Sequence, residues 1–139
     1  LFHDCGIPVM ALKYDDYVRV LGEANRNYHE TQCELEQARY QTDHATIGYF
    51  IATSWHLPKD ICQLILRHHE REYLKNLEGS VDQLSFAVLK MAENMVYSER
   101  RHVAAPDWAY VKEQALDVLG FSEDDYNDLK EDIADCILG

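Results

Sequence analysis

The chain has 139 residues, of which 47% are hydrophobic, and its 25 Asp and Glu residues against 13 Lys and Arg residues give a formal net charge of −12. The apolar fraction is too high for a disordered chain, and the length suffices for one domain with its own core. An acidic surface repels phosphate backbones, which argues against direct nucleic-acid binding but not against a small anion held in a local pocket. No run of about 18 apolar residues occurs, so we expect no membrane span.

The cysteines form no C-x-x-C pair, which argues against a zinc knuckle or a thioredoxin-type motif. Cysteines scattered over apolar helix faces usually behave as small buried hydrophobic residues; here they are Cys5, Cys33, Cys62 and Cys136. Because no secretion signal is visible, we expect a reducing, cytoplasmic location. The chain begins at Leu1, without Met and inside an apolar pattern, so we interpret it as a fragment of a longer polypeptide.

The first 40 residues contain three predicted helical segments. Residues 1–6 resemble the last turn of a helix, with Gly6 just past its end. A helix with a break near Asp15 and Asp16 follows, and then a loop at 25–27. Thr31 and Glu34 form a capping-box pattern for a short helix that runs to about Tyr40.

The middle of the chain contains two apolar helical patterns. Thr42 is the predicted N-cap of a helix over 43–55, in which Gly48 indicates a close helix crossing. Its inward face would be Ile47, Phe50, Ile51 and Trp55. Pro58 and Asp60 begin a helix that ends at His68-His69. The apolar set of that second helix is Ile61, Leu64 and Ile65.

The last part of the chain also predicts helices. Residues 71–79 are expected to be a mobile connection, and Ser80 to cap a helix that runs to about Tyr97. The inward residues of that helix would be Leu84, Ala87, Val88, Met91 and Met95. Pro106-Asp107 starts another helix, which Gly120 ends, and Ser122 with Asp125 resembles a capping box for a last helix to about Leu138. Because no segment predicts a strand, the fold class is all-α, with 1–139 as a single helical domain.

Histidines and carboxylates recur at helix ends or beside packed helix faces. These candidates are His3, Asp4, His44, His68, His69 and Glu93. Imidazole and carboxylate together suit zinc, iron or manganese. Several such groups from different helices could hold one or two metal ions, which could activate water for phosphoester hydrolysis.

The same residues also have a structural explanation without a metal. A histidine near a helix C-terminus is favoured by the helix dipole, which would account for His3, His68 and His69. His44 would then be a structural hydrogen-bonding residue, and Glu93 would face solvent. Spacing alone favours this explanation over the metal site. His29, His56 and His102 fit no cluster and are expected at the surface or in loops.

Four segments, in this order, resemble the HDOD family, the bacterial HD-related output domain. They are LFHDCG at 1–6, TDHATIG at 42–48, WHLP at 55–58 and ILRHHE at 65–70. The resemblance covers about residues 1–97, and residues 106–139 would form closing helices. It implies a compact, all-helical, HD-domain-like bundle, of which this chain would be the C-terminal part. HDOD domains are related to HD and HD-GYP phosphohydrolases and usually act as regulatory domains in signalling proteins.

The resemblance also assigns the candidate residues. His3 and Asp4 match the HD dipeptide, His44 matches the next ligand histidine, and Glu93 falls roughly where active relatives place a last aspartate. His68-His69 matches the paired histidines of the HD-GYP relatives. Two departures concern activity, because Ile7 replaces a lysine of the active relatives and residues 71–77 replace their G-Y-P motif. The resemblance therefore implies a retained pocket, with iron, manganese or zinc as its metal, and argues against cyclic-di-GMP hydrolysis.

The sequence thus supports more than one function. The first is a non-enzymatic signal-transduction output domain that contacts a signalling protein, or a fused sensor or receiver domain. The alternative is a divergent metal-dependent phosphohydrolase or phosphodiesterase with the six candidate residues as metal ligands. A purely structural helical module is a third interpretation.

Overall fold

The computed structural model describes residues 2–77 and 81–138, and every regular element in these ranges is a helix. The predicted all-α class is therefore confirmed. The chain divides into two compact units, Leu1–Glu70 and Arg71–Gly139. Among the described helices, none combines the length and the apolar character that crossing a bilayer would require.

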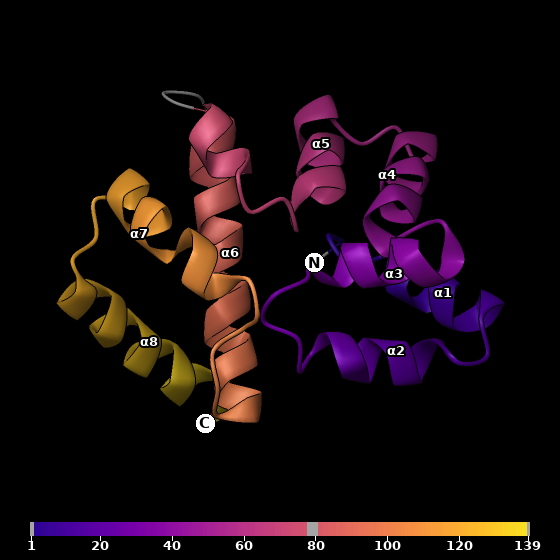
Figure 1. Cartoon of the computed structure of the whole chain (residues 1–139). Coiled ribbons are helices and arrows are strands. Elements are labelled where there is room, and N and C mark those ends of the chain that lie inside the picture. The colour runs from indigo at the N-terminus through magenta and orange to yellow at the C-terminus, as the bar shows by residue number, and fades with distance from the viewer. Residues whose placement is uncertain (1, 78–80, 139) are drawn as a thin grey trace. The chain divides into compact units, whose positions relative to one another are not determined.

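The first unit is organised around α4, which packs against α1, α3 and α5 (Figure 1). α2 completes the unit by packing against α1 and α3. The helices are α1 Gly6–Lys13, α2 Tyr17–Ala24, α3 Gln32–Tyr40, α4 His44–Ser54 and α5 Lys59–Arg67. The break predicted near Asp15 and Asp16 is confirmed, because it falls between α1 and α2.

Local hydrogen bonds set the starts of α3 and α4. Thr31 Oγ1 accepts from the Glu34 N–H at 3.1 Å, and the Glu34 carboxylate accepts from the Thr31 N–H at 2.6 Å, so the predicted capping box is confirmed. The N-cap of α4 is Asp43 and not Thr42, because Asp43 Oδ1 accepts from the Thr46 N–H at 2.7 Å. A carboxylate at this place also complements the positive end of the helix dipole.

The prediction for residues 1–6 is wrong in one respect, because Gly6 begins α1 and does not follow a helix end. A Cβ atom on Gly6 would lie 1.9 Å from the backbone oxygen of His44, closer than any side chain tolerates. Gly48 allows the same crossing from the side of α4, since a Cβ there would lie 3.0 Å from Ile65 Cγ2 and 3.3 Å from Cys5 Sγ. The close crossing predicted from Gly48 is confirmed, and Gly6 supplies its other half.

The inward face of α4 differs from the prediction. Phe50 and Trp55 are 64% and 60% exposed. The buried residues of this helix are instead His44, Ala45, Gly48 and Ala52. Backbones that cross this closely leave room only for small side chains, so the bulky aromatic residues lie outside the crossing. In α5, similarly, Cys62 and Ile65 are buried whereas Ile61 is 39% exposed.

The second unit is organised around α6, which packs against a 3₁₀ helix, α7 and α8 (Figure 1). The elements are η1 Tyr73–Leu77, α6 Val81–Arg101, α7 Trp108–Leu119 and α8 Glu123–Leu138. The mobile connection predicted over 71–79 is wrong for η1, where Tyr73 and Leu74 are buried. Ser80, the predicted cap of α6, lies outside the described residues.

The core of the second unit lies on a face of α6 slightly rotated from the predicted one. Leu84 and Val88 are 48% and 50% exposed. The buried residues of α6 include Phe86, Ala87, Lys90, Met91, Asn94 and Met95. The two predicted signals after α7 are confirmed: Gly120 ends the helix in the left-handed conformation, and Ser122 and Asp125 exchange hydrogen bonds as a capping box. Cys136, on α8, is exposed and does not follow the expectation of buried cysteines.

Candidate metal centre

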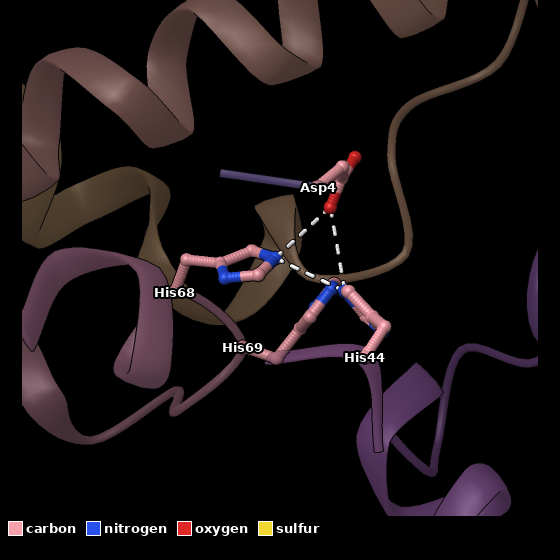
Figure 2. A group of neighbouring side chains, drawn as sticks. All are labelled: Asp4, His44, His68 and His69. Carbon is pink, nitrogen blue, oxygen red and sulfur yellow. Dashed lines mark hydrogen bonds and ion pairs between the residues drawn. The ribbon is translucent and has the colours of Figure 1, made fainter. Parts of the chain in front are cut away.

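Four side chains of the first unit point toward one another where α1, α4 and the end of α5 meet (Figure 2). Asp4 precedes α1, His44 is the first residue of α4, and His68 and His69 follow α5. One ligand atom from each residue lies within 4.8 Å of the ligand atoms of the others. The fold therefore brings together residues that are far apart in the sequence.

The centre of the cluster is a triangle of three polar atoms. Asp4 Oδ1 lies 3.3 Å from His44 Nε2 and 3.2 Å from His68 Nε2, and the two nitrogens lie 3.2 Å apart. Both imidazoles are completely buried. The His69 ring packs against both, with ring centroids 5.0 Å from His44 and 4.3 Å from His68.

Each buried imidazole is held by a hydrogen bond from its other nitrogen. His68 Nδ1 lies 2.6 Å from the backbone oxygen of Ile65, and because a carbonyl only accepts, Nδ1 carries the proton. His44 Nδ1 likewise donates to Glu36 Oε1 at 2.6 Å. Both Nε2 atoms therefore face the centre with a lone pair available, next to the Asp4 oxygen. Such an arrangement requires a cation between the three atoms, either a proton or a metal ion.

In the metal-free cluster this cation is a proton on His44. Burial lowers the pKa of His44, but hydrogen bonds to Asp4 and Glu36 outweigh it and raise this pKa to about 9. Burial and the neighbouring His69 lower the pKa of His68 to about 4. Burial would raise the pKa of Asp4, but its hydrogen bonds to His3, His44 and His68 hold this pKa well below its usual range.

The comparison with family models finds the HDOD domain over residues 1–71, a segment that contains the whole four-residue cluster. The chain belongs to the HDOD family. This is a signalling-associated family of HD-related domains. The matched segment is shorter than the range of about 1–97 expected from the sequence. Neither the comparison with curated proteins nor the comparison with solved structures gives a match.

The cluster of this HDOD domain fits a transition-metal ion. One carboxylate and three imidazoles form the mixed oxygen and nitrogen donor set that zinc, iron and manganese accept. A tetrahedral zinc site with bonds of about 2.0–2.1 Å has its ligand atoms about 3.3 Å apart. The observed separations of 3.2 and 3.3 Å among Asp4, His44 and His68 match this spacing. These residues, with His69, are the ones that would hold the ion.

His3 lies beside this cluster. Its Nε2 is 3.2 Å from Asp4 Oδ2, the carboxylate oxygen that faces away from the triangle, and its ring packs edge-on against His68 at 5.1 Å. Its Nδ1 is buried and has no hydrogen-bond partner among the described residues. The structure thus places His3 in contact with Asp4, and its assignment as a metal ligand stays a prediction.

Glu93 belongs to the second unit of the chain, on α6. Its carboxylate accepts from Lys90 Nζ at 2.8 Å, and Lys90 lies 3.3 Å from Asp107 Oδ2. Lys90 is buried, which alone would lower its pKa, but Glu93 and Asp107 outweigh burial and raise this pKa, so Lys90 is charged. Glu93 therefore neutralises a buried lysine in its own unit, and its role as a ligand stays a prediction.

The remaining histidines follow the prediction, and one buried residue was not predicted. His29, His56 and His102 are all exposed. Glu36 is fully buried behind His44, although the pattern of α3 points to Leu35 and Ala38 as its apolar residues. No spacing rule separates Glu36 from the exposed Glu34 of the same helix, so the sequence contains no local signal for it.

Proposed function

We propose that this HDOD domain is a non-enzymatic output domain of bacterial signal transduction, in which the cluster of Asp4, His44, His68 and His69 holds a divalent metal ion that ties its helices together. The observation that supports this most directly is the convergence of Asp4 Oδ1 with the Nε2 atoms of His44 and His68 at 3.2–3.3 Å. These residues belong to three separate segments, so one ion bound to them would fix the crossing of α1, α4 and α5.

Two features favour a structural ion over a catalytic one. Structural zinc sites have four protein ligands, whereas catalytic sites keep a position open for water. Four side chains are available here, and His44 and His68 are completely buried. Ile7 also stands where a lysine of active relatives would meet a substrate phosphate, so that contact is lost.

The output would be a protein contact made by helix surfaces. Phe50 and Trp55 are exposed aromatic side chains at α4 and its C-terminal end, and Phe2 packs edge-on against Trp55 with ring centroids 5.8 Å apart. Exposed aromatic residues of this kind are enriched at protein interfaces. We propose as partner a signalling protein, or a fused sensor or receiver domain, in the cytoplasm, and we expect no nucleic acid or membrane partner.

The proposal is tested by metal analysis of the purified protein. We expect about one equivalent of zinc, iron or manganese, and a lower melting temperature after chelation, because an ion that binds only the folded state stabilises it. Asp4→Ala and His68→Ala should lose the metal, whereas His29→Ala, an exposed histidine outside the cluster, should retain it. A wild-type protein without bound metal above background would contradict the metal role.

Phosphohydrolase activity is the second candidate, because His3 Nδ1 is a buried polar atom beside the cluster that no described residue satisfies. The assay is turnover of a generic phosphodiester with added manganese. The proposed output domain should give none above buffer. Turnover that Asp4→Ala and His68→Ala abolish, and His29→Ala does not, would establish the enzyme and contradict the non-enzymatic proposal.

A further inference from the structure

We infer that Glu36 is a positioning residue for the metal site, held by Tyr17 and Gln32 so that it orients His44 toward the ion; this inference rests on the metal site proposed above. Glu36 lies on α3 and is completely buried. A carboxylate is costly to bury unless it is paired and hydrogen-bonded. The hydrogen-bond partners of Glu36 must therefore offset the cost of burying its charge behind His44.

The partners of Glu36 divide between its two oxygens. Oε1 accepts from His44 twice, from the backbone N–H at 3.0 Å and from Nδ1 at 2.6 Å. Oε2 accepts from the Tyr17 hydroxyl and from Gln32 Nε2, the latter at 3.4 Å. Oε1 thus binds the first residue of α4, and Oε2 is held by side chains of α2 and α3.

This arrangement argues that Glu36 is not itself a metal ligand. Cys33, Glu36 and His44 also have ligand atoms close enough together to hold an ion. An ionised carboxylate has about four lone-pair directions, however, and the four donors around Glu36 use them. A metal in that second group would also need His44 Nδ1, the nitrogen that donates to Glu36.

The same arrangement specifies what Glu36 does for His44. A carboxylate that accepts from Nδ1–H fixes the tautomer and the ring orientation, and it makes Nε2 a stronger donor to a metal. His68 receives the corresponding support from the backbone oxygen of Ile65, which no substitution removes. Glu36 is therefore the point at which a side-chain change can loosen one imidazole of the cluster while all four ligands remain.

The test is a zinc competition titration of the full chain against a chromophoric chelator, with the metal alone as probe. Glu36→Gln keeps the shape of the side chain but removes its charge, and it should weaken zinc binding by roughly 10–100-fold. Tyr17→Phe removes one hydroxyl that fixes Oε2 and should give a smaller loss in the same direction. Glu34→Gln, two residues away on the same helix and exposed, is the matched control and should bind zinc like the wild type.

A second readout distinguishes the positioning role of Glu36 from a purely structural one. It is the ¹⁵N chemical shifts of the imidazole nitrogens in the zinc-bound protein. We expect His44 in the wild type to be protonated at Nδ1 and bound through Nε2, and Glu36→Gln to lose this single state. An unchanged His44 signal, or zinc affinity in Glu36→Gln equal to that of Glu34→Gln, would overturn the inference. So would a fall from two bound zinc ions to one, since Glu36 would then be a ligand. A wild-type chain that binds neither zinc nor iron nor manganese would overturn the proposed metal role and this inference with it.

Discussion

His44 and His68 are both completely buried and their Nε2 atoms lie 3.2 Å apart, yet their pKa values move in opposite directions. Two carboxylates, Asp4 and Glu36, contact His44 and stabilise its charged form. His68 donates to a neutral carbonyl, and burial, His69 and the charged His44 all lower its pKa. One proton is therefore kept on Nε2 of His44, and a metal ion would take the position of this proton.

This asymmetry predicts how the stability of the metal-free protein depends on pH. His44 binds a proton in the folded state up to about pH 9 but in the unfolded chain only up to about 6.5. Its contribution to stability is therefore complete below pH 6.5, falls as the pH rises above this value and is lost as the pH rises through 9. His68 stays neutral in the folded state down to about pH 4, so stability falls as the pH drops below 6.5. We expect urea unfolding in the presence of a chelator to show maximal stability near pH 6.5, with slopes of up to about 1.4 kcal/mol per pH unit on either side.

One variant and its control test the alkaline side of this profile. His44→Gln should flatten the alkaline limb, because the residue that releases the proton is gone. His29→Gln changes an exposed histidine and should leave the profile as it is. A metal-free stability that stays constant from pH 6.5 to 9 would show that His44 is not held protonated.

At the scale of helices, the crossing of α1 and α4 decides whether the cluster forms. Gly6 brings the start of α1 against the His44 backbone, and Asp4 is placed by the turn that leads into Gly6. Gly48 provides the facing surface on α4 and contacts α5 through Ile65. The two glycines therefore position the three segments that carry the candidate ligands, without contacting a metal themselves.

Gly6→Ala tests this crossing. The new Cβ would meet the His44 backbone oxygen, which cannot move aside as a flexible side chain can, so we expect a loss of about 3 kcal/mol or more in the free energy of unfolding. The measurement is urea denaturation followed by circular dichroism. Gly22→Ala on α2 is the matched control, because its Cβ would have only Arg26 Nη1 at 4.0 Å, and alanine is favoured in a helix by up to about 1 kcal/mol. Equal stabilities of the two variants would contradict the importance of the crossing.

At the scale of the whole molecule, the negative charge is concentrated in one element. The net charge is −12, and α8 contains a single basic residue, Lys130, against seven acidic ones. They are Glu123, Asp124, Asp125, Asp128, Glu131, Asp132 and Asp135. A surface of this kind repels polyanions over a distance that shortens as salt is added.

The charge predicts that the protein does not bind nucleic acid directly. Fluorescence anisotropy of a labelled DNA duplex should show no association at about 150 mM salt, where the Debye length is about 8 Å. Lowering the salt should not restore binding, because repulsion grows as screening weakens. Association that strengthens steeply at low salt, as counterion release requires, would contradict this prediction.

Features that depend on neighbours within about one helical turn could be predicted from the sequence. The capping boxes at Thr31 and Ser122, the end of α7 at Gly120 and the all-α class were predicted because their hydrogen bonds and periodicity are local. The ordered motifs also indicated the HDOD family and named Asp4, His44, His68 and His69, which the fold brings together.

The buried face of each helix and the residues that support the cluster depend instead on how the helices pack. Phe50 and Trp55 are apolar and regularly spaced but exposed, because the backbones of α1, α4 and α5 approach too closely to leave room for them. Glu36 is charged but fully buried, because its donors come from Tyr17 and His44, which lie on other helices. Packing and buried charge depend on partners that are distant along the chain, and a pattern within one helix contains no information about them.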